Sequence, residues 1–212
     1  MAELLMLNNV RLSFPQLVEP RASTLNPEAP KKYSADFIMA PDHPGFAAFI
    51  KAFQTDAADK WKENAAQIMQ MINADRKLRC YAQGSEKINS KTFKPYDGYE
   101  GMVCITASKI EAPQMIKPDG KPSENTMEYQ QLARKLYGGC YVNAVVKPWL
   151  QENKHGRGIR CDLIAIQFSQ DGEAFGEGST NASSLGSTDA SSLFGAVGGA
   201  APAAPAFPSF MG

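Results

Sequence analysis

The chain has 212 residues, of which 43% are hydrophobic, so one domain with its own core and an appendage is expected. All 22 Lys and Arg residues lie at or before Arg160, whereas 5 of the 22 acidic residues follow it, so residues 1–160 carry a net charge of +5 in a formally neutral chain. No apolar run reaches the ~18 residues that a membrane span needs, and the start Met1-Ala2-Glu3 does not resemble a signal peptide. We therefore expect a cytoplasmic protein with no membrane partner and a basic body suited to a polyanion.

Strand-like alternation opens the chain. In residues 5–18, Val10, Leu12 and Phe14 share one face, and residues 31–39 alternate in the same way around Phe37. Both phenylalanines are expected in the core. From residue 42 to residue 72 the apolar spacing becomes helical, with Asp42 as the expected N-cap and Pro44 in the first turn, and it fits one long helix or two shorter ones.

Short strands and loops fill the middle of the chain. Residues 77–82 are read as a strand with Arg79 and Tyr81 on one face, and residues 102–110 as a further strand. Between them lies a polar segment, residues 83–101. Pro118-Asp119-Gly120 predicts a turn, and residues 124–137 fit a short helix.

Two further strands, residues 137–149 and 154–168, are joined by a basic, glycine-rich hairpin. Alternation places Cys140, Val142, Ala144 and Val146 on a core face, and Tyr141, Asn143, Lys147 and Trp149 on the other. An aromatic and basic strand face beside a basic loop suits a single-stranded nucleic acid, because aromatic rings stack on bases and cations follow phosphates.

The element order predicts a mainly-β fold with α insertions, with a long helix after the second strand. An OB-fold-like five-stranded barrel fits this order best, although alternation alone does not separate it from a small sandwich. Cys80, Cys104, Cys140 and Cys161 each fall in a predicted strand without CxxC spacing, and neither His43 nor His155 lies at metal-ligand spacing from a cysteine. We expect buried free thiols, no metal and no cofactor.

The composition changes at Gly176. Of the 37 residues from there to the end, 25 are Gly, Ala, Ser or Pro and none is Lys or Arg. Such a segment buries too little apolar surface to offset its ordering entropy. We expect a domain over residues 1–175 and a disordered tail over residues 176–212, with an aromatic tip at Phe207 and Phe210 that either docks on a partner or has no role.

Several stretches resemble a family of bacteriophage replicative single-stranded-DNA-binding proteins. The most specific is Gly138-Gly139-Cys140-Tyr141-Val142-Asn143-Ala144, followed by Gly158-Ile159-Arg160-Cys161-Asp162-Leu163, Ala165-Ile166-Gln167-Phe168 and Asp171-Gly172-Glu173. Asn9-Val10-Arg11-Leu12-Ser13-Phe14 and Tyr96-Asp97-Gly98-Tyr99-Glu100-Gly101 are similar to further marks of the family. The resemblance spans about residues 8–175.

This resemblance implies an OB-fold, sequence-non-specific binding of single-stranded DNA and a role in phage DNA replication and recombination in the cytoplasm of the infected host. Weaker binding of duplex DNA is a further expectation. Such proteins commonly end in an acidic, aromatic-tipped tail that competes with DNA and recruits replication proteins. Here only Glu177 and Asp189 are acidic after residue 176, so docking of a polymerase or helicase through Phe207 and Phe210 is retained and electrostatic competition is in doubt.

The expected DNA-binding residues combine Lys and Arg side chains, which would contact phosphates, with aromatic side chains, which would stack on nucleobases. They are Arg79, Tyr81, Lys91, Phe93, Lys94, Tyr96, Tyr99, Tyr141, Lys147, Trp149, Lys154, Arg157 and Arg160. Residues 93–99 are expected on a flexible loop that closes over the strand.

Two other function classes stay open at this point. A metal-dependent nuclease needs converging carboxylates, for which Asp36, Asp97, Glu100 and Asp162 are available without a compact motif. A phage structural or assembly protein would use the same aromatics in a protein interface. No phosphate loop or nucleophile elbow is present, so a non-enzymatic protein is expected.

Overall fold

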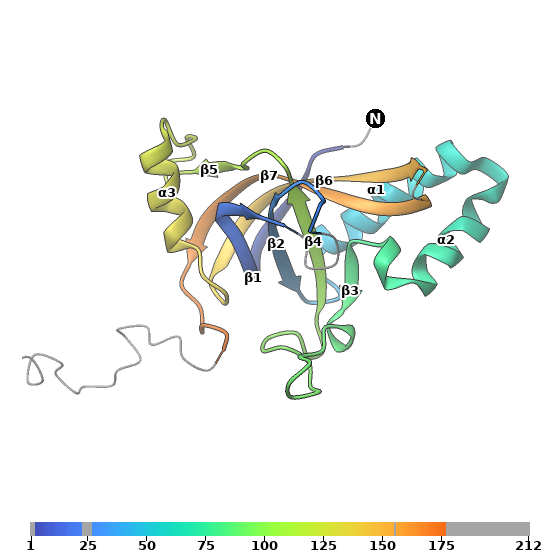
Figure 1. Ribbon diagram of the computed structural model, residues 1–212, viewed down its shortest axis with the longest axis horizontal. Helices are drawn as coiled ribbons and strands as arrows, with labels where there is room; N and C mark the ends of the chain where they lie inside the picture. Colours follow the sequence, from blue (N-terminus) through green and yellow to red (C-terminus); the bar gives the residue numbers. More distant parts are fainter. Residues whose placement is uncertain (1–2, 23–26, 155, 177–212) are drawn as a thin grey trace, which may run out of the picture. The chain divides into compact units, whose positions relative to one another are not determined.

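The structure is a computed structural model that describes residues 3–22, 27–154 and 156–176. The chain divides into two units, residues 1–179 and residues 180–212, and every described residue belongs to the first. This unit holds one seven-stranded sheet, in the order β3-β4-β2-β1-β6-β7-β5, with the helices inserted between strands (Figure 1). The predicted tail, including Phe207 and Phe210, lies outside the described residues apart from Gly176.

The elements follow one another in the order that the sequence predicts, with one additional short strand, β5. They are β1 (Leu5–Arg21), β2 (Lys32–Met39), α1 (Pro44–Trp61), α2 (Ala65–Ala74), β3 (Tyr81–Gln83), β4 (Val103–Lys109), β5 (Gln114–Ile116), α3 (Thr126–Lys135), β6 (Tyr141–Asn153) and β7 (Gly156–Gln170).

A mainly-β fold with helical insertions is therefore confirmed. The central strands β4, β2, β1, β6 and β7 pair antiparallel in that order, with β3 added at β4 and β5 added in parallel at β7. Strands β4 and β7 lie close in space, but no ladder between them is present among the described strands, so a closed five-stranded barrel is not confirmed. The edge strand β5 has only three residues, too few for alternation to reveal.

Two helices occupy the region where the sequence allowed one or two. A short 3-10 turn over Lys62–Asn64 separates α1 from α2. The apolar stripe is core as predicted, with Phe49, Phe53 and Ile72 buried. The N-cap is His43 and not Asp42, because the His43 ring Nδ1 accepts a hydrogen bond from the Gly45 backbone N–H.

A bulge in β1 overturns one core prediction. The pairing of β1 with β2 shifts between Ser13 and Gln16, and Phe14 adopts a φ of 46°. This shift turns Ser13 inward and leaves 46% of Phe14 exposed, whereas Phe37 is buried as expected. Alternation fails at a bulge because one extra residue reverses the faces of the strand.

The long hairpin of β6 and β7 confirms the predicted pair of strands. Cys140, Val142, Ala144 and Val146 are buried, and Tyr141, Asn143 and Lys147 are half-buried on the opposite face. The hairpin extends beyond the sheet beside α1 and α2 (Figure 1), and it contacts both helices.

The segment expected as a strand over residues 77–82 differs in structure. Arg76–Leu78 form a 3-10 turn capped by Asp75, whose carboxylate accepts from the Lys77 N–H, and β3 begins only at Tyr81. The predicted turn at Pro118-Asp119-Gly120 is confirmed, with Gly120 at a φ of 82°.

The four cysteines are free thiols. Cys104, Cys140 and Cys161 are buried as expected and Cys80 is partly exposed, but Cys80 and Cys140 lie just before their strands and not within them. No helix among the described residues is long and apolar enough to cross a membrane.

Candidate nucleic-acid interface

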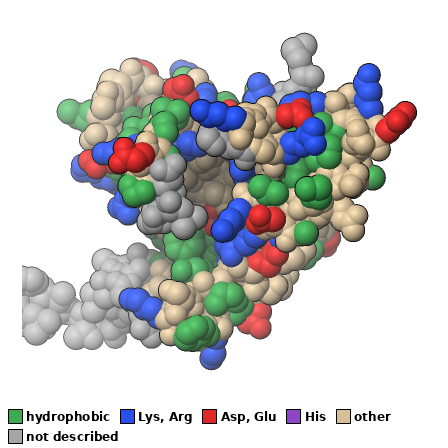
Figure 2. Space-filling model, turned by 45° about the vertical axis from the view of Figure 1, so that its right-hand side comes forward, with side chains coloured by type: hydrophobic (Ala, Val, Ile, Leu, Met, Phe, Trp, Pro, Cys, Tyr) green, Lys and Arg blue, Asp and Glu red, His purple; other side chains and the backbone are tan. Residues whose placement is uncertain are grey.

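A basic cleft of about 340 Å³ separates the β4 side of the sheet from the β6–β7 hairpin. Seen from this side, the molecule is hollowed and Lys and Arg side chains gather around the hollow (Figure 2). Strands β2, β4, β6 and β7 and the segment before β3 all contribute to the lining. The residues that define the basic cleft are Lys32, Arg76, Arg79, Cys80, Lys87, Thr106, Ser108, Trp149, Gln151, Arg160, Cys161 and Asp162.

Three cations of the basic cleft form no salt bridge within the described part of the chain, namely Lys32, Arg76 and Arg160. The Arg76 guanidinium donates to the Glu86 carbonyl, and its charge helps to lower the pKa of the Glu86 carboxyl. Arg160 is nevertheless held in place. Its Nε donates to the Gln151 side-chain oxygen at 2.8 Å, and its Nη1 donates to the Lys77 carbonyl at 3.0 Å. Neutral acceptors fix the guanidinium without cancelling its charge, which suits it to a phosphate.

Trp149 lies opposite Arg160 in the β6–β7 ladder and is 36% exposed. Its indole N–H donates to the Asp162 carboxylate at 2.8 Å, so one edge of the ring is fixed while part of its surface faces solvent. Lys147 pairs in register with Asp162 on the same face. Of the aromatic and basic strand face predicted from the sequence, Trp149 lines the basic cleft.

Arg79 reaches the same cleft but is occupied. Its guanidinium binds the Glu86 carboxylate through two hydrogen bonds, of 3.1 Å and 2.5 Å, and only 9% of its side chain is exposed. The hydrogen bond to Glu86 raises the pKa of Arg79, and the same bond lowers the pKa of Glu86. We correct its predicted role, because a bidentate carboxylate leaves little of this guanidinium for a phosphate.

Tyr81 also lies away from a binding surface. Its ring stacks on Phe53 of α1 at 5.3 Å between centroids and forms part of the packing around the core. Its hydroxyl donates to the Asn73 side chain, and burial raises the pKa of the phenol. Both the ring and the hydroxyl of this half-buried residue are already engaged, so the arrangement does not favour the predicted stacking of Tyr81 on a base.

Tyr99 is fully buried, so the predicted base contact at this residue is wrong. Its hydroxyl donates to the Asp36 carboxylate at 2.8 Å, which also accepts from Lys87 Nζ at 2.6 Å and from the Thr106 hydroxyl at 2.5 Å. Burial raises the pKa of Tyr99. This network attaches the segment of residues 84–101 to β2 and β4 through Lys87 and Tyr99.

A second hollow, of about 730 Å³, lies on the other side of this segment. We call it the aromatic groove and define it by Phe14, Lys91, Lys94, Tyr96 and Phe175. The Phe14 and Tyr96 rings meet edge to face at 4.9 Å. Phe93 stands on the same segment with 82% of its surface exposed.

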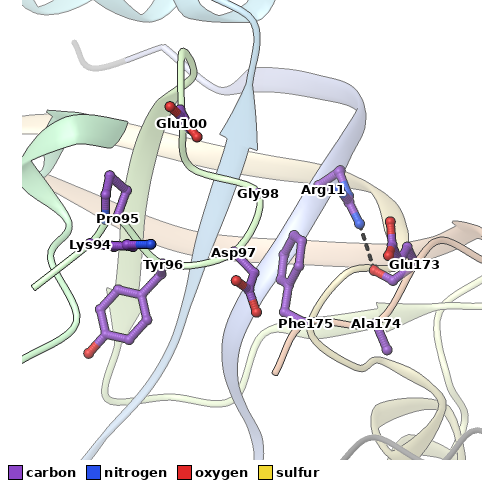
Figure 3. A pocket seen from close by; sticks show the side chains of 10 residues that line it. All are labelled: Arg11, Lys94, Pro95, Tyr96, Asp97, Gly98, Glu100, Glu173, Ala174 and Phe175. Atoms are coloured by element: carbon purple, nitrogen blue, oxygen red, sulfur yellow. Dashed lines mark hydrogen bonds between the residues drawn. The ribbon is translucent and has the colours of Figure 1, made fainter. Parts of the chain in front are cut away.

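The chain after β7 runs along a neighbouring hollow of about 610 Å³. The Arg11 guanidinium lies over the Phe175 ring at 4.3 Å and donates to the Glu173 carbonyl at 2.6 Å. Figure 3 shows the Phe175 ring between the Arg11 and Asp97 side chains, while Tyr96 points away from them. Arg11 also lies 5.6 Å from the centre of the Tyr141 ring, which places Tyr141 beside this segment and away from the basic cleft.

The remaining predicted residues lie toward the tip of the hairpin. Lys154 is exposed, and Arg157 is paired with Glu152 at 2.7 Å beside an apolar hollow that includes Ile68 and Met71 of α2. The structure thus brings Trp149 and Arg160 together at the basic cleft, with Lys147 paired in register with the cleft residue Asp162, and it brings Lys91, Lys94 and Tyr96 together at the aromatic groove.

Sequence reasoning missed five residues that line these sites: Lys32, Arg76 and Lys87 in the basic cleft, and Phe14 and Phe175 in the aromatic groove. The two phenylalanines had no signal, because strand alternation assigned Phe14 to the core and Phe175 borders the tail. The three cations had only their charge.

A family model described as the Enterobacter phage Enc34 ssDNA-binding protein matches residues 3–194 of this chain. The chain belongs to the Enc34 ssDNA-binding protein family. Its similarity to "Putative protein p50" of Acyrthosiphon pisum secondary endosymbiont phage 1 reaches 32% identity over 171 residues, which cover 80% of this chain and 84% of that protein.

Solved structures of the Enc34 protein are similar as well. The chain is 27% identical to the single-stranded DNA-binding protein from bacteriophage Enc34, with a TM-score of 0.58, over 85% of this chain and 88% of that one. It is 26% identical to the same protein in complex with ssDNA, with a TM-score of 0.61, over 82% and 89% of the two chains. The resemblance to phage single-stranded-DNA-binding proteins is confirmed.

The carboxylates considered for a nuclease do not converge. No group of three metal-ligating side chains occurs within residues 3–22, 27–154 and 156–176. Asp36 is engaged by Lys87, Tyr99 and Thr106, and Asp162 accepts from Trp149. This arrangement does not favour the two-metal or hydrolytic chemistry that a nuclease requires.

Proposed function

We propose that this protein is a non-enzymatic, sequence-non-specific single-stranded-DNA-binding protein that acts in phage DNA replication and recombination. The observation that carries the proposal is the basic cleft, where these three cations and a partly exposed tryptophan face one hollow. Membership of the Enc34 family and similarity to a family structure in complex with ssDNA support it.

In this proposal the phosphates run along Lys32, Arg76 and Arg160, and one base stacks on Trp149. Each neutralised phosphate releases a counterion, so the affinity is sensitive to salt. Stacking adds about 1–3 kcal/mol per base without reading the sequence, because every base has a π-face. Lys147 and Lys154 extend the cationic path along the hairpin.

The position of the basic cleft also supports an OB-like binding mode. OB-folds bind oligonucleotides on the face of their second and third strands, between two hairpin loops. Here β2 and β4 take those places in chain order, and β6–β7 supplies the flanking hairpin. We propose that β4, β2, β1, β6 and β7 are the five strands of an OB-like domain within residues 1–175.

The remaining expectations are part of the same proposal. The tail over residues 176–212 would be disordered and would dock a phage polymerase or helicase through Phe207 and Phe210. Duplex DNA would bind more weakly, and the protein would act in the cytoplasm of the infected host.

The test is a titration of a labelled oligothymidine, followed by fluorescence anisotropy, together with alkylation of Cys80, the one partly exposed thiol of the basic cleft. We expect saturable binding that weakens with salt and slower alkylation of Cys80 in the bound state. A Cys80→Ser variant is the control that identifies the modified thiol.

Lack of binding at low salt would refute the proposal and favour an assembly protein. Binding without protection of Cys80 would move the site away from the basic cleft. Cleavage of the oligonucleotide on addition of magnesium would favour a nuclease.

A further inference from the structure

The aromatic groove lies outside the basic cleft but shares the segment of residues 84–101 with it. Lys87 lines the cleft, while Lys91 and Lys94 line the groove. The groove is also the larger hollow, about 730 Å³ against about 340 Å³. A single strand that leaves the cleft past Lys87 therefore meets the groove next.

The conformation of Phe14 is unfavourable in two ways, because its backbone is strained and its apolar ring is partly exposed. Its φ of 46° lies in the left-handed region, which a bulky side chain enters only with strain of about 1 kcal/mol or more. Its ring is 46% exposed, so it also forgoes the burial that the rest of the strand gains. A bulky aromatic residue that is both strained and exposed points to a ligand contact.

Phe93, on the segment of residues 84–101, also combines a positive φ with an exposed ring. Its φ is 56° and it is 82% exposed. The turn that presents it is closed by backbone bonds, from Phe93 N to the Asn89 carbonyl at 2.8 Å and from Asn89 N to the Lys94 carbonyl at 2.9 Å. The ring is thus presented by a fixed turn.

The charged side chains around the groove would orient a bound strand, with its phosphates toward the lysines and its bases toward the aromatic rings. Lys91 and Lys94 form no ion pair within the described residues, so both are available to phosphates. Asp97 also lines the groove and accepts from the Gly176 N–H at 3.1 Å. A carboxylate repels phosphate but tolerates an uncharged base, so the bases would face the rings and the phosphates would follow the lysines.

We propose that the aromatic groove, together with Phe93 on the segment that borders it, is a second binding subsite. In this subsite Phe14 and Tyr96 of the groove and the exposed Phe93 stack on unpaired bases of the strand held in the basic cleft. This inference rests on the proposed function and adds to it a separate place where bases are held. A strand long enough to fill both hollows gains the stacking, and a short one does not.

The experiment compares two oligothymidines, of about 6 and about 20 nucleotides, a range set by the site sizes of OB-folds. The variants are Phe14→Asn and Phe93→Asn, because asparagine accepts a positive φ and removes the ring without new strain. Met127→Asn on α3 is the matched control, since Met127 is an exposed apolar residue outside both hollows. Circular dichroism and thermal melting verify the fold of each variant.

We expect each groove variant to weaken binding of the longer oligonucleotide about fivefold or more, because one stack accounts for about 5- to 150-fold. Binding of the shorter one and both affinities of Met127→Asn stay at the wild-type level. A 5-iodouracil oligonucleotide is expected to cross-link to Phe14, Phe93 or Tyr96. Should Phe14→Asn fail to fold, the highly exposed Phe93 carries the test.

The inference is overturned if both groove variants bind the longer oligonucleotide as the wild type does while Arg160→Ala weakens both oligonucleotides. In that case the proposed function stands. If the wild type binds neither oligonucleotide, the proposed function itself fails, and the exposed rings become candidates for a protein interface.

Discussion

Arg160 shows at the scale of one residue how a cation is kept available. Its partners are the Gln151 amide oxygen and the Lys77 carbonyl, both neutral. Arg157, three positions earlier on the same hairpin, is instead paired with the Glu152 carboxylate. Both arginines lie on the same basic hairpin in the sequence, but only the charge of Arg157 is neutralised by a carboxylate. The hairpin sequence alone does not reveal this difference.

We predict that Arg160→Ala weakens binding of single-stranded DNA and lowers the slope of log affinity against log salt by about 0.7, the value for one phosphate contact on a single strand. Arg157→Ala is the matched comparison and is expected to change the slope less, because Glu152 already neutralises it. Anisotropy titrations at several salt concentrations measure both. Equal slope changes in the two variants would contradict the role assigned to Arg160.

At the scale of an element, one buried carboxylate fixes the segment of residues 84–101. Asp36 on β2 receives hydrogen bonds from Lys87, Tyr99 and Thr106, and it is itself 5% exposed. The segment contributes to both hollows, so its attachment to the sheet positions Lys87 on one side and Lys91 and Lys94 on the other. The buried hydrogen bonds of Asp36 therefore position the surface lysines that are proposed to contact DNA.

Removing the carboxylate leaves the Lys87 ammonium, with 15% of its side chain exposed, without its partner. We predict that Asp36→Ala destabilises the protein by about 3–5 kcal/mol, as for other broken buried pairs. Tyr99→Phe, which loses one hydrogen bond and keeps the ring, is expected to lose about 1–3 kcal/mol. Urea unfolding measures both, and a smaller effect for Asp36→Ala than for Tyr99→Phe would contradict the central place of the carboxylate.

The elements that could be predicted from the sequence are those with a long, regular period. The stripe of α1 and the alternation of β6 reported their buried faces correctly. The bulge at Phe14 could not be predicted, because a register shift depends on the partner strand and leaves no local pattern. Tyr81 and Tyr99 were expected to contact DNA at the surface. Contacts distant in sequence, with Phe53 and Asp36, instead leave Tyr81 half-buried and Tyr99 fully buried.

The candidate site was predictable to a similar extent. The face with Lys147 and Trp149 followed from alternation, and Arg160 followed from the hairpin composition. The cations of other elements, such as Lys32 and Arg76, were not predicted, because only the folded sheet brings β2 and the segment before β3 to the same cleft.

At the scale of the whole described unit, weakly acidic side chains, namely thiols and phenols, lie in or against the core, and burial favours their neutral form. Burial raises the pKa of Cys104 to about 12 and that of Cys140 to about 11, and it raises the pKa of Cys161 as well. Burial likewise raises the pKa of the buried Tyr99 and of the partly buried Tyr129. In the unfolded chain these groups ionise at ordinary values, about 8.5 for a thiol and about 10 for a phenol.

The folded protein therefore holds more protons than the unfolded chain above about pH 8.5. We predict that the free energy of unfolding is constant up to that pH with respect to these groups and falls as the pH rises toward 11 and 12, because the unfolded state loses protons first. Urea unfolding at several alkaline pH values measures it. A Cys104→Ala/Cys140→Ala variant is expected to show a shallower decline, and an unchanged decline would contradict the assignment to these thiols.

The glycines before β6 have a consequence for how relatives of this chain are recognised. A Cβ on Gly139 would collide with the Glu173 carbonyl, and a Cβ on Gly172 would collide with the Gly139 carbonyl. Two stretches distant in sequence therefore approach so closely that each requires a glycine without a side chain at the contact. Both stretches belong to the motifs that mark the family, yet neither lines the basic cleft. These two glycines therefore permit a close approach of two backbone segments and make no contact in the basic cleft. A relative that shares the two stretches need not share the ligand, because the residues of the cleft decide what is bound.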